Sequence, residues 1–227
     1  MDTPQIKEKR PLLIMIEGPP WVGKTVCAAE VFESLENSAW LDGDDVWQVN
    51  PLSTEDPRIR KGDKNVSFVL NTYLELDFNY VVYSSVLLGN EEITNNILDT
   101  IGMKDYDRIL FMLICTMDTL KERSVKRDGE PSPGVYFLNE AENRDAVHLD
   151  TTISTPQEVA GRILDIVLDP AGAGLASVQK GRVREWKSIT PLTLRSTNKL
   201  AFLFTILTKQ PNIYKINSIN IKMIRRI

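Results

Sequence analysis

The sequence contains few of the residues that build metal and disulfide centres. Of its 227 residues, two are cysteine and one is histidine. Cys27 and Cys115 each lie in an apolar stretch, which favours two buried thiols over a disulfide or a zinc site. These absences exclude a disulfide-stabilised scaffold and indicate a reducing compartment, so we expect a cytoplasmic protein.

Long apolar runs are also missing. No segment approaches the roughly 20 apolar residues that cross a membrane as a helix, and the most apolar window, Leu200–Leu207, is too short. Residues 1–11 are polar and lack the apolar segment of a secretory signal. We therefore expect no transmembrane segment.

Basic residues are scarce over the first three quarters of the chain. Residues 1–169 contain 16 Lys and Arg against 30 Asp and Glu, whereas residues 170–227 contain 11 against the single acid Glu185. The acidic part lacks the basic stripe of a nucleic-acid binder, so no nucleic-acid partner is expected. The reversal predicts a domain over 1–169 and a basic, poorly ordered extension over 170–227. In the alternative interpretation the extension docks on the domain, a partner or an anionic surface.

The apolar pattern of residues 1–169 alternates between short continuous runs and helical stripes. The runs predict strands at 12–17, 39–41, 79–84, 108–115 and 146–149. The stripes predict helices at 24–36, 66–76, 91–101, 118–127 and 156–168. We expect Asp118 to cap the fourth helix, and Thr155 with Glu158 to form a capping box on the fifth. This order implies an α/β fold with a parallel sheet covered on both faces.

The segment from Gly18 to Thr25, GPPWVGKT, matches the Walker A pattern G-x-x-x-x-G-K-[ST]. A predicted strand precedes it and a predicted helix follows, as a phosphate-binding P-loop requires. Its backbone N–H groups and the positive helix end would hold phosphates, Lys24 would reach the β- and γ-phosphates, and the Thr25 hydroxyl would bind Mg²⁺. The predicted ATP-binding residues of the loop are Gly18, Trp21, Val22, Gly23, Lys24, Thr25 and Val26.

An acidic turn, Asp42-Gly-Asp44-Asp45, follows the second predicted strand. Residues i and i+2 of an extended chain point the same way, so Asp42 and Asp44 should converge at the edge where parallel sheets bind ligands. We expect Asp42 to bind Mg²⁺ with Thr25, and Asp44 to accept the proton of an attacking hydroxyl as the catalytic base. The alternative is a solvated turn.

With these motifs the sequence resembles the P-loop small-molecule kinases, namely the shikimate, gluconate and adenylylsulfate kinase group, and more loosely bacterial AAA-type nucleotide kinases. The resemblance covers roughly residues 10–168 and rests on GPPWVGKT, on LDGD at 41–44 and on LKERSVKR at 120–127. It implies a five-stranded parallel sheet of order 2-3-1-4-5 with a small lid, which we place at 128–139. Trp21 departs from the pattern, because many nucleotide kinases have glycine there. Pro19 and Pro20 also lack the N–H groups of a usual loop.

The resemblance assigns a role to two arginines of the predicted fourth helix. Arg123 and Arg127 are four residues apart and therefore share a face. By resemblance both close over the ATP phosphates, with Arg123 stabilising the charge of the transferred phosphoryl group. The alternative is a solvated charged face.

Two further groups are open to two interpretations each. Arg58, Arg60, Lys61 and Lys64 form a basic cluster that either lines a pocket for an anionic acceptor or is a solvated loop. His148 is expected to be structural. Together the motifs predict a kinase that uses ATP and Mg²⁺ to phosphorylate a small hydroxyl- or phosphate-bearing acceptor. The alternatives are a P-loop ATPase or a nucleotide-dependent switch without an acceptor.

Overall fold

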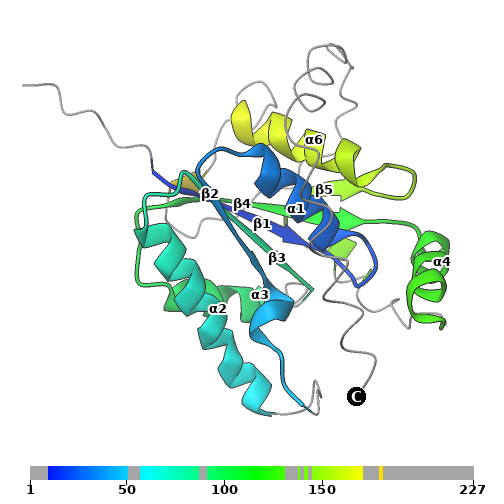
Figure 1. Ribbon diagram of the computed structural model, residues 1–227, viewed down its shortest axis with the longest axis horizontal. Helices are drawn as coiled ribbons and strands as arrows, with labels where there is room; N and C mark the ends of the chain where they lie inside the picture. The colour runs from blue at the N-terminus through cyan, green and yellow to red at the C-terminus, as the bar shows by residue number, and fades with distance from the viewer. Residues whose placement is uncertain are drawn as a thin grey trace, which may run out of the picture. The chain divides into compact units, whose positions relative to one another are not determined.

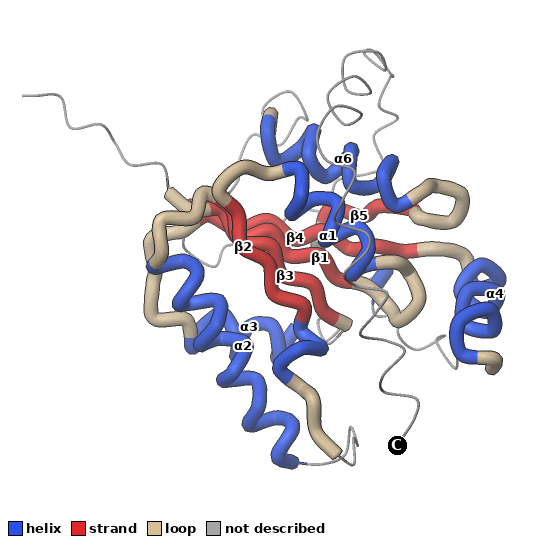
Figure 2. Tube along the Cα trace, viewed as in Figure 1, coloured by secondary structure: helices blue, strands red, loops and turns tan. Residues whose placement is uncertain are grey.

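The computed structural model describes residues 10–50, 57–86, 91–130, 138, 141–142, 145–170 and 179–180. The chain divides into two units, Met1–Ile189 and Thr190–Ile227, and every described residue belongs to the first. Its centre is a sheet whose parallel strands have the order β2-β3-β1-β4-β5, which confirms the predicted order (Figures 1 and 2). The strands are β1 Leu12–Glu17, β2 Ser38–Asp42, β3 Tyr80–Ser85, β4 Asp107–Ile114 and β5 Val147–Asp150.

A sixth, two-residue strand, β6 (Gln179–Lys180), extends the sheet beyond the five expected strands. The short β5 pairs only with the last four residues of β4, and β6 pairs antiparallel with Asp107 and Arg108 at the beginning of β4. The sheet therefore includes residues beyond position 169, where the sequence predicts the domain to end. The remainder of the predicted extension, residues 171–178 and 181–227, lies outside the described residues.

Helices cover both faces of the sheet. Figure 1 shows α1 and α6 on one face and α2 and α3 on the other. No helix in the described part of the chain is both long and apolar enough to cross a membrane. The helices are α1 Lys24–Ser34, α2 Pro57–Glu75, α3 Glu91–Thr100, α4 Met117–Asp128 and α6 Pro156–Leu168, with a 3₁₀ helix η1 at Gly43–Val46.

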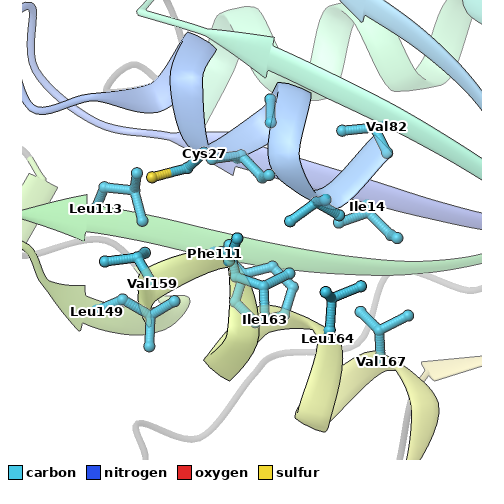
Figure 3. Close-up of a cluster of buried hydrophobic side chains, with 14 of the residues drawn as sticks. Ile14, Cys27, Val82, Phe111, Leu113, Leu149, Val159, Ile163, Leu164 and Val167 are labelled. Atoms are coloured by element: carbon cyan, nitrogen blue, oxygen red, sulfur yellow. The ribbon is translucent and has the colours of Figure 1, made fainter. Parts of the chain in front are cut away.

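The central strand β1 supplies both halves of the core. Leu13 and Met15 point to the side covered by α2 and α3, whereas Ile14 and Ile16 point to the side covered by α1 and α6. All four are at most 2% exposed, as the continuous apolar run predicts. Figure 3 shows the side covered by α1 and α6, where side chains of both helices pack with side chains of β4. Because β1 is buried on both faces, the loop that follows it has a rigid base.

Three helix starts test the sequence reasoning. The capping box of α6 is confirmed, because the Thr155 hydroxyl accepts the N–H of Glu158 and the Glu158 carboxylate accepts the N–H of Thr155. The prediction for α4 is wrong: Thr116 is the cap, and Asp118 lies in the first turn. Helix α2 begins at Pro57 instead of Val66. The apolar pattern missed its first two turns because they are polar and show no apolar stripe.

The capping box gives a test of stability. Thr155→Ala should lower the free energy of unfolding by about 1 kcal/mol, because the first-turn N–H of α6 loses its acceptor. The matched control is Thr72→Ala, whose exposed hydroxyl bonds only the Phe68 carbonyl of its own helix. Urea unfolding of the two variants measures the difference, and equal stabilities would contradict a stabilising cap.

Candidate active site

The loop between β1 and α1 has a backbone conformation that requires glycine at two positions. At Gly18 (φ 149°) a Cβ would collide with the carbonyl oxygen of Leu113 on the neighbouring strand β4. Gly23 (φ 102°) precedes α1 as its N-cap and makes no side-chain cap. Gly18 is therefore required by the close approach of β4, and Gly23 by a positive φ that residues with a Cβ rarely adopt.

The start of α1 is arranged to bind an anion. The first helical hydrogen bond runs from the Cys27 N–H to the Gly23 carbonyl, so the N–H groups of Lys24, Thr25 and Val26 have no intrahelical acceptor. The first turn contains no acidic residue to offset the positive helix end. Thr25 and Val26 are exposed, whereas Val22 is buried and offers only its backbone to the loop.

Lys24 folds back onto this loop. Its Nζ donates to the carbonyl oxygen of Pro19 at 2.8 Å. Loss of solvent around the amine lowers its pKa to about 8, and the nearby charges of Asp44 and Asp42 partly oppose that shift. The amine is therefore poorly solvated, and a bound phosphate would favour its charged form.

Asp42 and Asp44 come together, although not as the sequence predicts. Asp44 lies in η1 instead of an extended chain, and its N–H donates to Asp42 Oδ1 at 3.1 Å, which caps η1. Asp42 Oδ2 accepts the Ser84 hydroxyl, and Ser84 Oγ in turn accepts the Trp40 indole N–H, both at 3.1 Å. Ser84 and Trp40 thus fix the orientation of Asp42, a role that the sequence does not indicate for either.

The carboxylate of Asp44 is a stronger base than an ordinary aspartate. The side chain is exposed, yet the surrounding protein removes part of its hydration. This desolvation raises the pKa of Asp44, the negative charge of Asp42 raises it further, and Lys24 opposes both. A carboxylate with a raised pKa accepts a proton more readily.

The residues at this edge fit a magnesium ion. Thr25 would contribute a hydroxyl and Asp42 a carboxylate, which are the hard oxygen donors that Mg²⁺ prefers, and Asp44 adds a second carboxylate beside Asp42. Among the described residues no group of three or more His, Cys, Asp and Glu side chains is placed to hold a metal. Mg²⁺ commonly takes only one or two carboxylates and completes its shell with water and substrate phosphates.

Arg123 is bound to the backbone of the phosphate loop and to the backbone just after β5. Its guanidinium donates to the Val22 carbonyl at 3.3 Å and to the Thr151 carbonyl at 2.6 Å. The Thr151 hydroxyl, 3% exposed, accepts from Arg123 and donates to the same Val22 carbonyl. These bonds join α4, the loop and the end of β5. Only the fold reveals the part of Thr151, since 28 residues separate it from Arg123.

Arg127, on the same helix, is in a different setting. Its side chain is exposed and forms an ion pair with Asp128 at 2.8 Å. The guanidinium carbon also lies 5.4 Å from the ring centroid of Trp21 in the phosphate loop. The structure thus brings together two residues that the sequence predicts to bind ATP, through a contact that the sequence does not predict.

The basic cluster lies on the first turns of α2. Arg58, Lys61 and Lys64 are exposed there, and the side chain of Arg60 lies outside the described residues. Burial raises the pKa of Tyr83 on β3, and the charge of the partly buried Asp63 adds to that shift. His148 is exposed on β5, and its Nε2 lies 2.9 Å from the Ala141 carbonyl oxygen.

Solved structures of several other proteins have a similar fold. Three examples are a tunicamycin resistance protein from Deinococcus radiodurans (22% identity, TM-score 0.57), a gluconokinase from Sinorhizobium meliloti (14%, 0.52) and the APS kinase of Mycobacterium tuberculosis (17%, 0.52). They align with 70%, 74% and 70% of this chain and with 96%, 97% and 98% of their own. The chain has the P-loop kinase fold. No model of a known protein family matches the sequence, and neither does any curated protein.

The lowered pKa of Lys24 predicts proton uptake on nucleotide binding. Bound phosphates favour the charged amine and raise its pKa, so at pH 8 binding should take up about half a proton, and less at pH 6.5. Calorimetry of ATP binding in buffers of different ionisation enthalpy measures the uptake.

The matched control is Lys24→Arg, because a guanidinium stays protonated throughout this range. Its uptake at pH 8 should be smaller than that of the native chain by about the same half proton. Equal uptake in the two proteins would contradict the assignment to Lys24.

Proposed function

We propose that the chain is an ATP-dependent phosphotransferase that moves the γ-phosphoryl group of ATP to a small acceptor bearing a hydroxyl or a phosphate. The observation that carries this proposal is the pairing of Lys24 and Asp44. One is a poorly hydrated cation at the phosphate loop, the other is a carboxylate with a raised pKa, and each shifts the pKa of the other. On this proposal the phosphates of ATP and the base would lie side by side.

The residues divide the work by charge. The N–H groups at the start of α1 and the Lys24 amine hold the β- and γ-phosphates, where negative charge gathers during transfer. Asp44 accepts the proton of an acceptor hydroxyl and so increases its nucleophilicity. Asp42 and Thr25 would hold Mg²⁺, which neutralises phosphate charge when bound.

Arg123 contributes by holding the loop in place. Its bonds to Val22 and Thr151 fix the loop relative to the end of β5. Positioning of the phosphates is a large part of catalysis in phosphoryl transfer, because the protein has little covalent chemistry to perform. Arg123 is therefore proposed to aid catalysis by keeping the phosphate loop in the geometry that binds the phosphates.

The fold neighbours support the kinase class. One of them, the APS kinase, was solved in complex with AMPPNP and APS, and a shikimate kinase from Acinetobacter baumannii (16% identity, TM-score 0.51) in complex with shikimate. Those ligands belong to those proteins. They illustrate that this fold can hold a nucleotide and a small acceptor together, which is the arrangement proposed for the present chain.

A screen for ATP consumption identifies the acceptor class. Hydroxylated metabolites, sugars, nucleosides and nucleotides are each incubated with the full chain, ATP and Mg²⁺, and phosphorus NMR follows a new phosphoester signal. The proposal expects ATP consumption that depends on an acceptor. Tight ATP binding without consumption for any acceptor would favour the nucleotide-dependent switch, and acceptor-independent release of inorganic phosphate would favour the ATPase.

The role of Asp44 gives a quantitative prediction. Asp44→Asn should lower kcat by about 10²–10⁴-fold, because the general base is removed. ATP affinity should change far less, since Lys24 and the loop amides remain. The matched control is Asp45→Asn, which removes the same charge one residue away and should keep kcat within about threefold, as expected of a long-range charge effect. Equal losses in the two variants would contradict the assignment.

A further inference from the structure

The phosphate loop and the end of α4 are joined by three side chains. The indole N–H of Trp21 donates to Asp128 Oδ2 across 107 residues of sequence. Asp128 receives two bonds from Arg127, from Nε at 2.8 Å and from Nη2 at 3.0 Å. The Arg127 guanidinium lies over the Trp21 ring. Each of the three residues therefore contacts the other two.

Trp21 holds a backbone conformation that is unfavourable for a tryptophan. Its φ of 63° is left-handed, a region that bulky residues seldom adopt. Such a conformation persists only where the surroundings fix it. Here the ring packs against the core cluster under α1 and α6, and its N–H is bound by Asp128. The loop therefore presents this ring to α4 in one orientation.

Arg127 keeps donors for a further ligand. A guanidinium has five N–H groups, and Asp128 uses two of them. Arg127 also acts electrostatically on the active site, because its charge contributes to the pKa shifts of both Lys24 and Asp44. The guanidinium therefore lies over the ring of a phosphate-loop residue, with three N–H groups that Asp128 does not use.

We propose that Trp21 and Asp128 are positioning residues for Arg127, which they hold at the phosphate loop so that its remaining N–H groups meet the terminal phosphates of ATP. This inference rests on the proposed nucleotide-binding function. The ring confines the guanidinium from one side by a cation–π contact, and the carboxylate fixes its plane through paired hydrogen bonds. The side chain of Trp21 thus acts on ATP through Arg127.

A double-mutant cycle on ATP affinity tests this dependence. In the native background, Trp21→Ala should weaken ATP binding about fivefold, the size expected of a cation–π contact at an exposed site together with a lost hydrogen bond. In the Arg127→Ala background the same change should have almost no further effect, because the residue that it positions is gone. Trp21→Phe, which keeps a ring and loses the N–H, should fall in between.

Two variants control for general effects of the substitutions. Phe68→Ala removes an aromatic ring that is 73% exposed on α2, and Lys126→Ala removes an exposed cation next to Arg127. Neither should change ATP affinity by more than about twofold at 0.15 M salt, where exposed charges are screened. Thermal unfolding of every variant establishes that differences in affinity do not reflect loss of the fold.

Tryptophan fluorescence of the nucleotide-free chain gives a readout that does not depend on activity. Arg127→Ala and Asp128→Asn should each shift the emission of the native chain, and neither should shift it when Trp21 is replaced by Phe. Unchanged emission, or losses of ATP affinity that add in the double variant, would overturn the positioning role alone. Absence of ATP binding by the native chain would instead contradict the proposed function, and the positioning role with it.

Discussion

The positive end of α1, together with the backbone turn that precedes it, is the constraint on which the rest of this structure depends. The turn needs glycine at Gly18, where the neighbouring strand leaves no room for a side chain, and at Gly23, where the helix begins. It also needs a firm structural support, which β1 provides because both of its faces are buried. The sheet and its covering helices thus hold one set of N–H groups in a fixed position.

Charges around this loop oppose one another in a way that a ligand would relieve. Lys24 loses hydration on folding, while Asp42 and Asp44 crowd two carboxylates beside it. The carboxylates do not fully offset the lowered pKa of Lys24, and Lys24 does not fully offset the raised pKa of Asp44. In the proposed function, a nucleotide with a divalent cation would supply charge of both signs at these positions, and its binding would stabilise the charged forms of these groups.

The sequence was most informative where local pattern and chemistry coincide. The strand, the glycine loop and α1 follow from contiguous residues, as does the capping box of Thr155 and Glu158, and the resemblance to kinases supplied the strand order. Reasoning from sequence failed where a polar turn competes with an extended chain, as at η1, and where two residues can both cap a helix, as with Thr116 and Asp118.

Contacts between distant segments were not accessible in this way. Arg123 with Thr151, Ser84 with Asp42, and Trp21 with Asp128 each join residues that only the fold brings together. A single sequence shows the residue types but not their neighbours. These three contacts orient Arg123, Asp42 and the phosphate loop. The geometry of the site therefore depends on contacts that cannot be read from the sequence.

ATP affinity of the native chain compared with Lys24→Ala tests the central claim most directly. If the loop from Gly18 to Thr25 is a nucleotide site, loss of this charge should weaken the binding of ATP with Mg²⁺ by at least about tenfold, or about 1.4 kcal/mol, as measured by calorimetry. Equal affinities in the two proteins, or no binding by the native chain, would contradict it.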